Sequence, residues 1–421
     1  MKLKIPIIII SILFSIQANC IHLLIPMDDS QKNHLKSYGI TFWVLENDIE
    51  VKWLLNYRGG SFLMQHSPQI ENECVVRGVT YESVTDGQAA AILDGIAQPD
   101  VNQDAVAMNK APKIAVYSPP NKQPWDDAVT LVLAYAEINY DVIYDEEIFD
   151  GKLSDYDWLH LHHEDFTGQF GKFWRVYQNA PWYQQEVAIN NELAKKLGFL
   201  KVSEMKSFVT REIEQYVLNG GFLFAMCAAT DTYDISLAAV GIDICESMFD
   251  GDPADKQAQE KLDFTHTFAF KDFELNMDPY AYEFSNIDAT ESRQVSVVRE
   301  NDYFTLFDFS AKWDPIPTML CQNHRNLIKG FMGQTTSYRK EVLKSGSLVM
   351  GENKAANEAR YIHGEQGKGF WTFYGGHDPE DYRHLVGDDP TDLSLFPTSP
   401  GYRLILNNVL FPAAKKKKRK T

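Results

Sequence analysis

Cysteines are few in this chain, and long hydrophobic runs are missing from all but its first residues. The five cysteines in 421 residues are widely scattered, which excludes a dense disulfide framework. After residue 20 no stretch is long and apolar enough to cross a bilayer, so we expect the remainder to be soluble and to lack a transmembrane helix. No internal repeat is present either, so a repeat architecture is not indicated.

Positive charge is also scarce. The chain has 40 Lys and Arg residues against 58 Asp and Glu residues, and its formal net charge is −18. An acidic surface repels nucleic acid, so we expect a small-molecule substrate and no nucleic-acid partner. The exception is the basic tail, residues 413–421, which is most simply a solvated end; contact with a membrane surface or an acidic partner is the alternative. The sequence leaves the substrate's identity and the oligomeric state open.

Residues 1–20 have the features of an export signal. A basic start precedes the apolar core Ile5 to Phe14, which is too short to span a bilayer. The small residues before Ile21 fit a signal cleavage site, so we expect the mature chain to begin there and to be periplasmic or secreted. In an alternative interpretation, Cys20 is the lipidated first residue of a lipoprotein.

The remaining chain divides into two parts. Residues 21–110 are predicted to form a small N-terminal α/β domain. From residue 111 to residue 412 short apolar strands alternate with helical segments, which is typical of an α/β fold with a doubly wound, mostly parallel, flavodoxin-like sheet. Two stretches interrupt this alternation and are predicted to be insertions: residues 171–200, which are aromatic and partly helical, and residues 263–346, which contain strand-like runs.

The first candidate for chemistry is Cys227. Two glycines precede the apolar run Phe222 to Met226, which is predicted to be a buried parallel strand, and a helical pattern follows. This order places Cys227 at a strand-to-helix turn, where backbone N–H groups and the positive helix end lower the pKa of a thiol and make it nucleophilic. The alternative is an inert cysteine that packs as a small hydrophobic residue.

A base for this thiol is predicted after the last strand, which runs into His377, Asp378 and Glu380. The carboxyl ends of parallel strands share one edge, so His377 should approach Cys227, with Glu380 or Asp378 orienting its imidazole. Backbone N–H groups from Ala228 onward should stabilise an oxyanion. These roles together predict an amide or ester hydrolase that requires no cofactor.

These features resemble the class I glutamine amidotransferase-like superfamily over residues 112–412. The resemblance rests on the Gly-Gly-strand-Cys227 turn and on the strand that leads to His377 and Glu380. It implies the same α/β fold and a cysteine-based hydrolase or amidotransferase. In this chain alanines, Ala225 and Ala229, stand where the family's glycines usually flank the cysteine, and two residues rather than one separate the histidine from the glutamate.

The end of the chain is similar to the ThuA-like branch of this superfamily. The similarity lies in Gly376 to Tyr382, followed by Tyr402 to Leu410. That branch is associated with sugar metabolism and generally does not depend on a cysteine. The resemblance therefore implies an alternative function as a metal-assisted or sugar-processing enzyme, and a non-catalytic exported binding protein is a third interpretation.

The whole chain is also similar to exported bacterial proteins commonly labelled asparagine synthetase B, including the stretches Leu159 to Phe166 and Trp125 to Val129. The residues do not support that activity. Such a synthetase uses a cysteine directly after the initiator methionine, where this chain has Lys2, and its ATP-binding Ser-Gly-Gly-x-Asp-Ser motif is absent.

A second group of candidate residues follows another predicted strand. His162, His163 and Glu164, together with Ala228, are predicted to bind substrate, because they should lie at the same sheet edge as Cys227.

The histidines of this group also fit a different role. His160, His162 and His163 predict a divalent metal site, with zinc as the candidate ion, since imidazoles suit such ions. Adding His377 across the sheet would give three ligands and an open position for water. The alternative is that histidines at a strand end only bond to the backbone or line a polar pocket.

Overall fold

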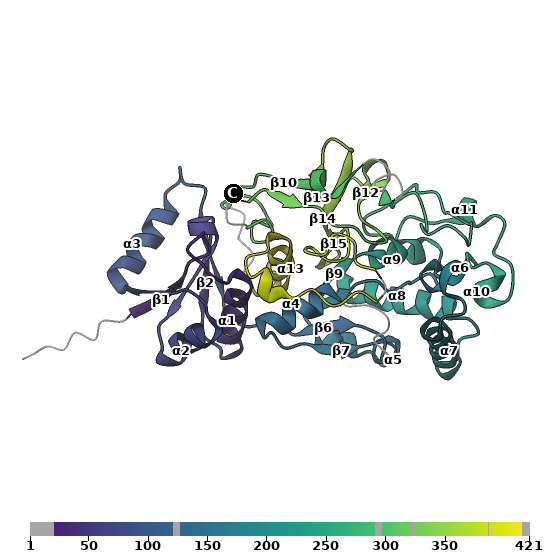
Figure 1. Ribbon diagram of the computed structural model, residues 1–421, viewed down its shortest axis with the longest axis horizontal. Coiled ribbons are helices and arrows are strands. Elements are labelled where there is room, and N and C mark those ends of the chain that lie inside the picture. Colours follow the sequence, from purple (N-terminus) through teal and green to yellow (C-terminus); the bar gives the residue numbers. More distant parts are fainter. Residues whose placement is uncertain (1–20, 121–126, 291–296, 322–324, 386, 415–421) are drawn as a thin grey trace, which may run out of the picture.

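The computed structural model of the protein describes residues 21–120, 127–290, 297–321, 325–385 and 387–414. The predicted signal peptide, Cys20 and nearly all of the basic tail lie outside these residues, as do Trp125 and Asp126. The described chain is an α/β protein built on two sheets (Figure 1). No helix in this part of the chain is long and apolar enough to cross a membrane.

The first sheet is antiparallel, with the strand order β4-β1-β3-β2-β5. Its helices begin where a side chain accepts a backbone N–H group: Asn33 caps α1, Ser67 caps α2 and Thr85 caps α3. The elements of this part are β1 (Ile21–Ile25), α1 (His34–Glu46), β2 (Val51–Leu55), β3 (Ser61–Gln65), α2 (Pro68–Arg77), β4 (Glu82–Thr85), α3 (Asp86–Ala97) and β5 (Asp104–Met108).

The second sheet is larger, and within the described residues it has ten strands. Their order is β11-β10-β13-β14-β15-β9-β8-β6-β7, and β12 pairs with β14. The strands are β6 (Ile114–Tyr117), β7 (Asp141–Ile143), β8 (Trp158–Leu161), β9 (Phe222–Met226), β10 (Tyr303–Leu306), β11 (Leu327–Lys329), β12 (Tyr338–Arg339), β13 (Leu348–Asn353), β14 (Glu358–Gln366) and β15 (Gly369–Tyr374).

This larger sheet is mixed, whereas the sequence predicted a mostly parallel one. The neighbours among β7, β6, β8, β9 and β15 are parallel, but β10 to β14 add antiparallel pairs beyond β15. The reason lies in the connections. Short turns join β13 to β14 and β14 to β15, and a short turn can only join antiparallel neighbours, whereas a parallel pair needs a long crossover.

Helices pack on both faces of the parallel strands, and β9 shows how. Its residues alternate between the faces: Phe224 and Met226 lie in the core that includes α4 and α13, while Leu223 and Ala225 lie in the core that includes α8 and α9. The helices of the first core are α4 (Ala128–Ala136) and α13 (Pro400–Leu410). Those of the second core are α8 (Val202–Leu218), α9 (Ala228–Ala238) and the short helix α5 (Asp145–Phe149).

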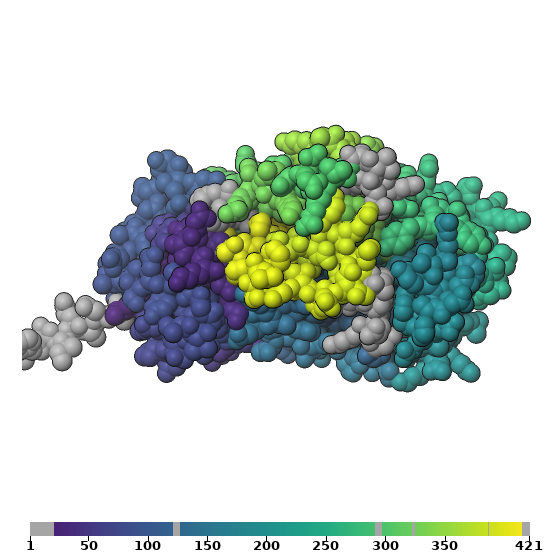
Figure 2. Space-filling view, viewed as in Figure 1, coloured from purple at the N-terminus to yellow at the C-terminus, as the bar shows by residue number. Residues whose placement is uncertain are grey.

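The two predicted insertions differ in kind. Residues 171–200 carry α6 (Trp174–Tyr177) and α7 (Pro181–Lys196), which lie at the right of Figure 1 near α10 (Ser247–Asp250) and α11 (Ala258–Lys261). Residues 263–346 instead contribute β10, β11 and β12 to the larger sheet. Figure 2 shows the C-terminal segment (yellow) between the N-terminal part (purple) and the segment with α6 and α7 (teal).

Helix α13 packs between the N-terminal part and the larger sheet. Helix α1 of the N-terminal part contacts both α13 and α4. Arg403 of α13 is 1% exposed and donates from Nε to Tyr38 Oη at 3.0 Å. The other guanidinium nitrogens donate to the backbone oxygens of Gly59 and Met27. A charged group that is removed from water needs such partners, so this contact holds the two parts in one arrangement.

Replacing Arg403 with Met should lower the free energy of unfolding by about 3 kcal/mol, because the buried oxygens that it contacts would lose a charged donor. Urea denaturation followed by circular dichroism measures this. Arg325→Met is the matched control, since Arg325 also reaches the N-terminal part, at Asp29, but through an exposed pair 3.9 Å apart. The control should change stability by less than about 1 kcal/mol. Equal losses in both variants would contradict a special role for Arg403.

Candidate active site at the carboxyl edge of the larger sheet

Three adjacent parallel strands end at the same level of the larger sheet. Leu161 of β8 pairs with Ala225 of β9, and Ala225 pairs with Phe373 of β15. The residues that follow these strands therefore meet at one edge. A cavity of about 320 Å³ lies there, and its lining includes three residues that the sequence predicted to be functional: His163, Cys227 and His377. The remaining lining residues are Phe173, Tyr282, Met332, Gly333, Gln334, Arg383, His384 and Leu385.

Cys227 occupies the junction between β9 and α9, at φ 49° and ψ −140°. A positive φ is uncommon outside glycine and costs about 1–3 kcal/mol, so the surrounding packing must hold this turn. The turn forms although alanines flank it; Ala225 and Ala229 are fully buried, and the Ala229 N–H donates to the backbone oxygen of His162 at 3.0 Å. The sharp strand-to-helix turn predicted from the sequence is present.

Cys227 is 3% exposed. Burial raises its pKa to about 11, although the backbone N–H groups of Gln334, Thr335 and Ala228 act in the opposite direction. The thiol is therefore protonated at neutral pH, and it faces N–H groups from both α9 and the segment 263–346. A negative charge at this place would find donors already arranged.

His377 lines the same cavity but lacks the carboxylate partner that the sequence predicted. Neither of its ring nitrogens has a hydrogen-bond partner among the described residues. Asp378 instead accepts the backbone N–H groups of Glu380 at 2.9 Å and Asp381 at 3.2 Å, so it closes its own turn. The Glu380 carboxyl has a side-chain bond to Ser399, and burial raises its pKa. The predicted orientation of His377 by Asp378 or Glu380 is thus not formed.

His384, which the sequence analysis missed, lines the same cavity and does have a carboxylate partner. Its Nδ1 lies 3.0 Å from Asp381 Oδ2, and its side chain is 3% exposed. Its ring stacks on that of His377, with 5.0 Å between the ring centroids. The spacing of three residues between Asp381 and His384 was the only signal in the sequence, and it is weak outside a helix.

Asp127 is a second residue at this edge for which the sequence analysis predicted no role in the site. It caps α4, accepting the N–H groups of Val129 and Thr130. It also contacts two histidines: Oδ1 lies 3.1 Å from His162 Nδ1, and Oδ2 lies 3.0 Å from His160 Nε2. Burial opposes ionisation of this carboxyl, but the two imidazoles hold its pKa well below the usual range.

The predicted metal set of His160, His162 and His163 does not converge. His160 uses both ring nitrogens elsewhere, Nε2 at Asp127 and Nδ1 at the Phe224 backbone oxygen, 3.2 Å away. One ring nitrogen from each of His162, His163 and His377 does converge, with all three within 4.8 Å of one another. Burial, together with the neighbouring imidazoles, keeps the pKa of both His163 and His377 well below its usual range, so both rings are neutral at neutral pH.

Among the four residues predicted to bind substrate, only His163 lines the large cavity. His162 and Ala228 are fully buried behind it. Glu164 turns back, and its Oε2 accepts the His162 backbone N–H at 3.1 Å. Burial and the nearby Asp127 raise the pKa of Glu164 to about 8.

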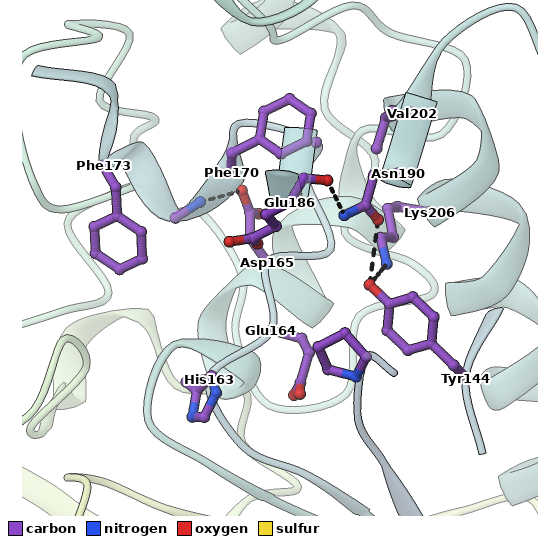
Figure 3. A pocket seen from close by; sticks show the side chains of 13 residues that line it. Tyr144, His163, Glu164, Asp165, Phe170, Phe173, Glu186, Asn190, Val202 and Lys206 are labelled. Carbon is purple, nitrogen blue, oxygen red and sulfur yellow. Dashed lines mark hydrogen bonds between the residues drawn. The ribbon is translucent and has the colours of Figure 1, made fainter. Parts of the chain in front are cut away.

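A smaller cavity of about 40 Å³ adjoins the site (Figure 3). Figure 3 shows Lys206 and Tyr144 on one side of it and Asp165 with Phe170 on the other, above Glu164 and His163. This volume suits about one or two water molecules, so it is too small for a substrate. Its polar lining supports the loop that carries His163.

Lys206 is the cation of this smaller cavity. Its Nζ donates to Asp145 Oδ2 at 2.7 Å, to Tyr117 Oη at 2.8 Å and to Tyr144 Oη at 3.1 Å. Tyr117 also donates to Asp145. Desolvation disfavours a buried lysine ion, but the contacts with Asp145 and Tyr144 together outweigh it and raise the pKa of Lys206 above its usual value.

No family model matches the chain, and no curated protein matches it. Among solved structures the chain is similar to the cytoplasmic protein STM3548 from Salmonella typhimurium, at 11% identity and a TM-score of 0.33, with 72% of this chain and 100% of that chain covered. The cytoplasmic protein STM1381 from Salmonella typhimurium LT2 is 12% identical at a TM-score of 0.35, with 72% of this chain and 100% of that chain covered. The GH42 β-galactosidase Gan42B is 12% identical at a TM-score of 0.27, with 64% of this chain and 28% of that chain covered. At such low TM-scores these likenesses carry no conclusion about function.

Replacing Lys206 with Met should lower the free energy of unfolding by about 3–5 kcal/mol, because Asp145 would remain buried without its cation. Lys196→Met is the control, since Lys196 forms an exposed pair with Glu146. That variant should stay within about 1 kcal/mol of the unmodified protein in the same urea titration. A Lys206→Met protein as stable as the control would show that the pair contributes little.

Proposed function

We propose that the chain is an exported member of the class I glutamine amidotransferase-like superfamily, ThuA-like branch, with a doubly wound, flavodoxin-like sheet at its centre. Two observations support the fold. The parallel strands β7-β6-β8-β9-β15, numbered along the chain, have the order 2-1-3-4-5 that defines flavodoxin-like sheets. Helices also lie on both faces of these strands. Ligands of such sheets bind at the carboxyl ends of the strands, where the large cavity lies.

We further propose that the protein is an enzyme that cleaves a small amide or ester with the Cys227 thiol as nucleophile. The observation that carries this proposal is the strained backbone of Cys227, with a positive φ at the end of β9, in a residue that lines the cavity. A buried structural cysteine has no need of a strained backbone, whereas a nucleophile gains exposure to substrate from such a turn.

The proposed reaction has two steps. The sulfur forms a bond to the carbonyl carbon of the substrate, and the thiol proton passes through an imidazole to the leaving nitrogen or oxygen as its bond to that carbon breaks. Water then hydrolyses the thioester, which releases the acid and restores the thiol. The N–H groups of Ala228, Gln334 and Thr335 are the donors available to the oxyanion in both steps.

The base in this mechanism must be an imidazole of the cavity. His377 was the candidate from the sequence, but His384 is the one with an orienting carboxylate, Asp381. A carboxylate on Nδ1 holds the ring in the tautomer whose Nε2 accepts a proton, so we assign the base to His384. His377 then remains free for another role.

A metal-assisted reaction is the second candidate function. The observation in its favour is the pair of buried imidazoles, His162 and His377, at the edge of the same cavity, whose nitrogens include three without a partner among the residues that the structure describes. A binding protein without catalysis would need neither these groups nor the strained cysteine. For that reason we favour both the thiol hydrolase and the metal-assisted enzyme over a non-catalytic binding protein.

Alkylation by iodoacetamide should modify Cys227 in the native protein, and its rate should rise about tenfold per pH unit between pH 7 and pH 10. The reason is that the thiolate fraction grows with pH below the raised thiol pKa of about 11. Peptide mass spectrometry measures the site and the rate. In hydrolysis assays on a panel of small amides and esters, Cys227→Ser should lose about 10³-fold or more of any activity found.

Two further variants test the assignment. Cys245→Ser is the matched control, because Cys245 is also buried but bonds to the Thr167 backbone oxygen at 3.2 Å and does not line the cavity. It should leave labelling and activity unchanged. His384→Gln should slow hydrolysis more than it slows alkylation. If Cys227 is modified only after unfolding, the thiol is an inert core group and the nucleophile proposal fails.

The proposal of export has its own test. The strand β1 begins at Ile21, so a chain cleaved before that residue keeps every strand that the structure describes in the first sheet. Intact-mass analysis of the protein recovered from the periplasm or medium of an expressing bacterium should give a chain that begins near Ile21. A diacylated Cys20 would favour the lipoprotein alternative, and a cytosolic protein that retains residues 1–20 would contradict export.

A further inference from the structure

Two buried histidines at the edge of the large cavity have ring nitrogens that bond to nothing in the described chain. His162 is fully buried, and its Nε2 has no partner; His377 is 7% exposed, and neither of its ring nitrogens has one. A buried polar atom without a partner costs about 1–3 kcal/mol. Unpaired imidazole nitrogens from two different segments that face one another therefore require an explanation.

Asp127 fixes which nitrogen of His162 is available. The carboxylate can only accept, so the His162 Nδ1, 3.1 Å from Asp127 Oδ1, carries the proton. The Nε2 of a neutral ring then presents a lone pair. This is the state in which histidines bind metal ions, and a carboxylate on the other nitrogen is their usual outer partner.

The convergence of three rings completes the geometry. One nitrogen each from His162, His163 and His377 lies within 4.8 Å of the other two. Around a tetrahedral zinc ion with Zn–N distances of 2.0–2.1 Å, such nitrogens lie about 3.4 Å apart. The largest separation must therefore shrink by about 1.4 Å at most when the ion binds.

We propose that His162, His163 and His377 bind one divalent transition-metal ion, with zinc as the leading candidate. Three imidazoles leave a fourth position open, as in catalytic zinc sites. Because His163 and His377 line the large cavity, that position faces the space where a substrate would lie. A carbonyl or a water molecule there would be polarised by the ion.

Asp127 and His160 form the outer layer of this site. Asp127 accepts hydrogen bonds from two backbone N–H groups at the start of α4, and these bonds set its position. His160 bonds to the other carboxylate oxygen and to the Phe224 backbone oxygen, which ties Asp127 to β8 and β9. Asp127 is therefore a positioning residue that sets the tautomer of His162.

The metal proposal goes beyond the thiol mechanism and does not depend on it. None of the three ligands is Cys227, and the base assigned above, His384, is not a ligand either. The two proposals can therefore fail separately.

The experiment uses the mature protein, stripped with EDTA and titrated with Zn²⁺ in a calorimeter, followed by metal analysis after dialysis. The unmodified protein should retain about one Zn²⁺ per chain. His377→Ala and His162→Ala should each weaken binding by about 100-fold or more. Asp127→Asn keeps the helix cap but loses the ionised acceptor, so it should weaken binding by about 10–100-fold. It should also shift the visible spectrum of the Co²⁺-loaded protein.

Three controls make the result specific. Cys227→Ala should keep full metal binding while it abolishes alkylation, which separates this proposal from the thiol mechanism. His266→Ala removes an exposed histidine that does not line the cavity and should have no effect on binding. His384→Ala should also retain the metal, which excludes the nearby cluster of Asp381, His384 and Asp388.

X-ray absorption of the unmodified Zn²⁺-loaded protein keeps the test decisive if a ligand variant does not fold. It should show nitrogen and oxygen neighbours at about 2.0–2.1 Å and no sulfur. A sulfur neighbour at about 2.3 Å would move the ion to a cysteine and overturn the proposal. So would a protein that retains no metal, or one in which His377→Ala binds Zn²⁺ as tightly as the unmodified chain.

Discussion

The register of three parallel strands is the constraint on which the candidate site depends. Because Leu161, Ala225 and Phe373 lie side by side across β8, β9 and β15, these three strands end at the same level of the sheet. The residues that follow the three strand ends are the candidate site residues His162 and His163, Cys227, and His377. A shift of the pairing by one residue would turn every side chain of a strand to the other face and separate them.

Burial gives the residues at this edge their chemical states. Desolvation keeps the Cys227 thiol and the His163 and His377 rings neutral, whereas Asp127 stays ionised because two imidazoles and the start of α4 bond to it. The site therefore combines neutral lone pairs and a neutral thiol with backbone donors. Such a set suits either nucleophilic attack on a carbonyl or coordination of an ion. In either case the substrate would lie in the same cavity, which Cys227, His163 and His377 line.

The rest of the fold holds and completes this edge. Segment 263–346 adds strands to the larger sheet and also supplies Gln334 and Tyr282 to the cavity wall. On the other side, the contact of Lys206 with Asp145 supports the smaller cavity, which the loop of His163 helps to line. Arg403 joins α13 to the N-terminal part. The cavity is thus built from segments that are far apart in the chain.

The sequence by itself determined the alternation of strands and helices as far as Cys227, the strand-to-helix turn at that residue, and the position of His162, His163 and His377 shortly after the ends of strands. These features follow from local hydrophobic periodicity and from glycine stops, which act over a few residues. Only the tertiary structure decided the pairing of partners: Asp127 with His160 and His162, Asp381 rather than Asp378 or Glu380 with an imidazole, and an antiparallel half beside the parallel strands. Those choices depend on side-chain directions and on contacts between distant segments, which no local pattern encodes.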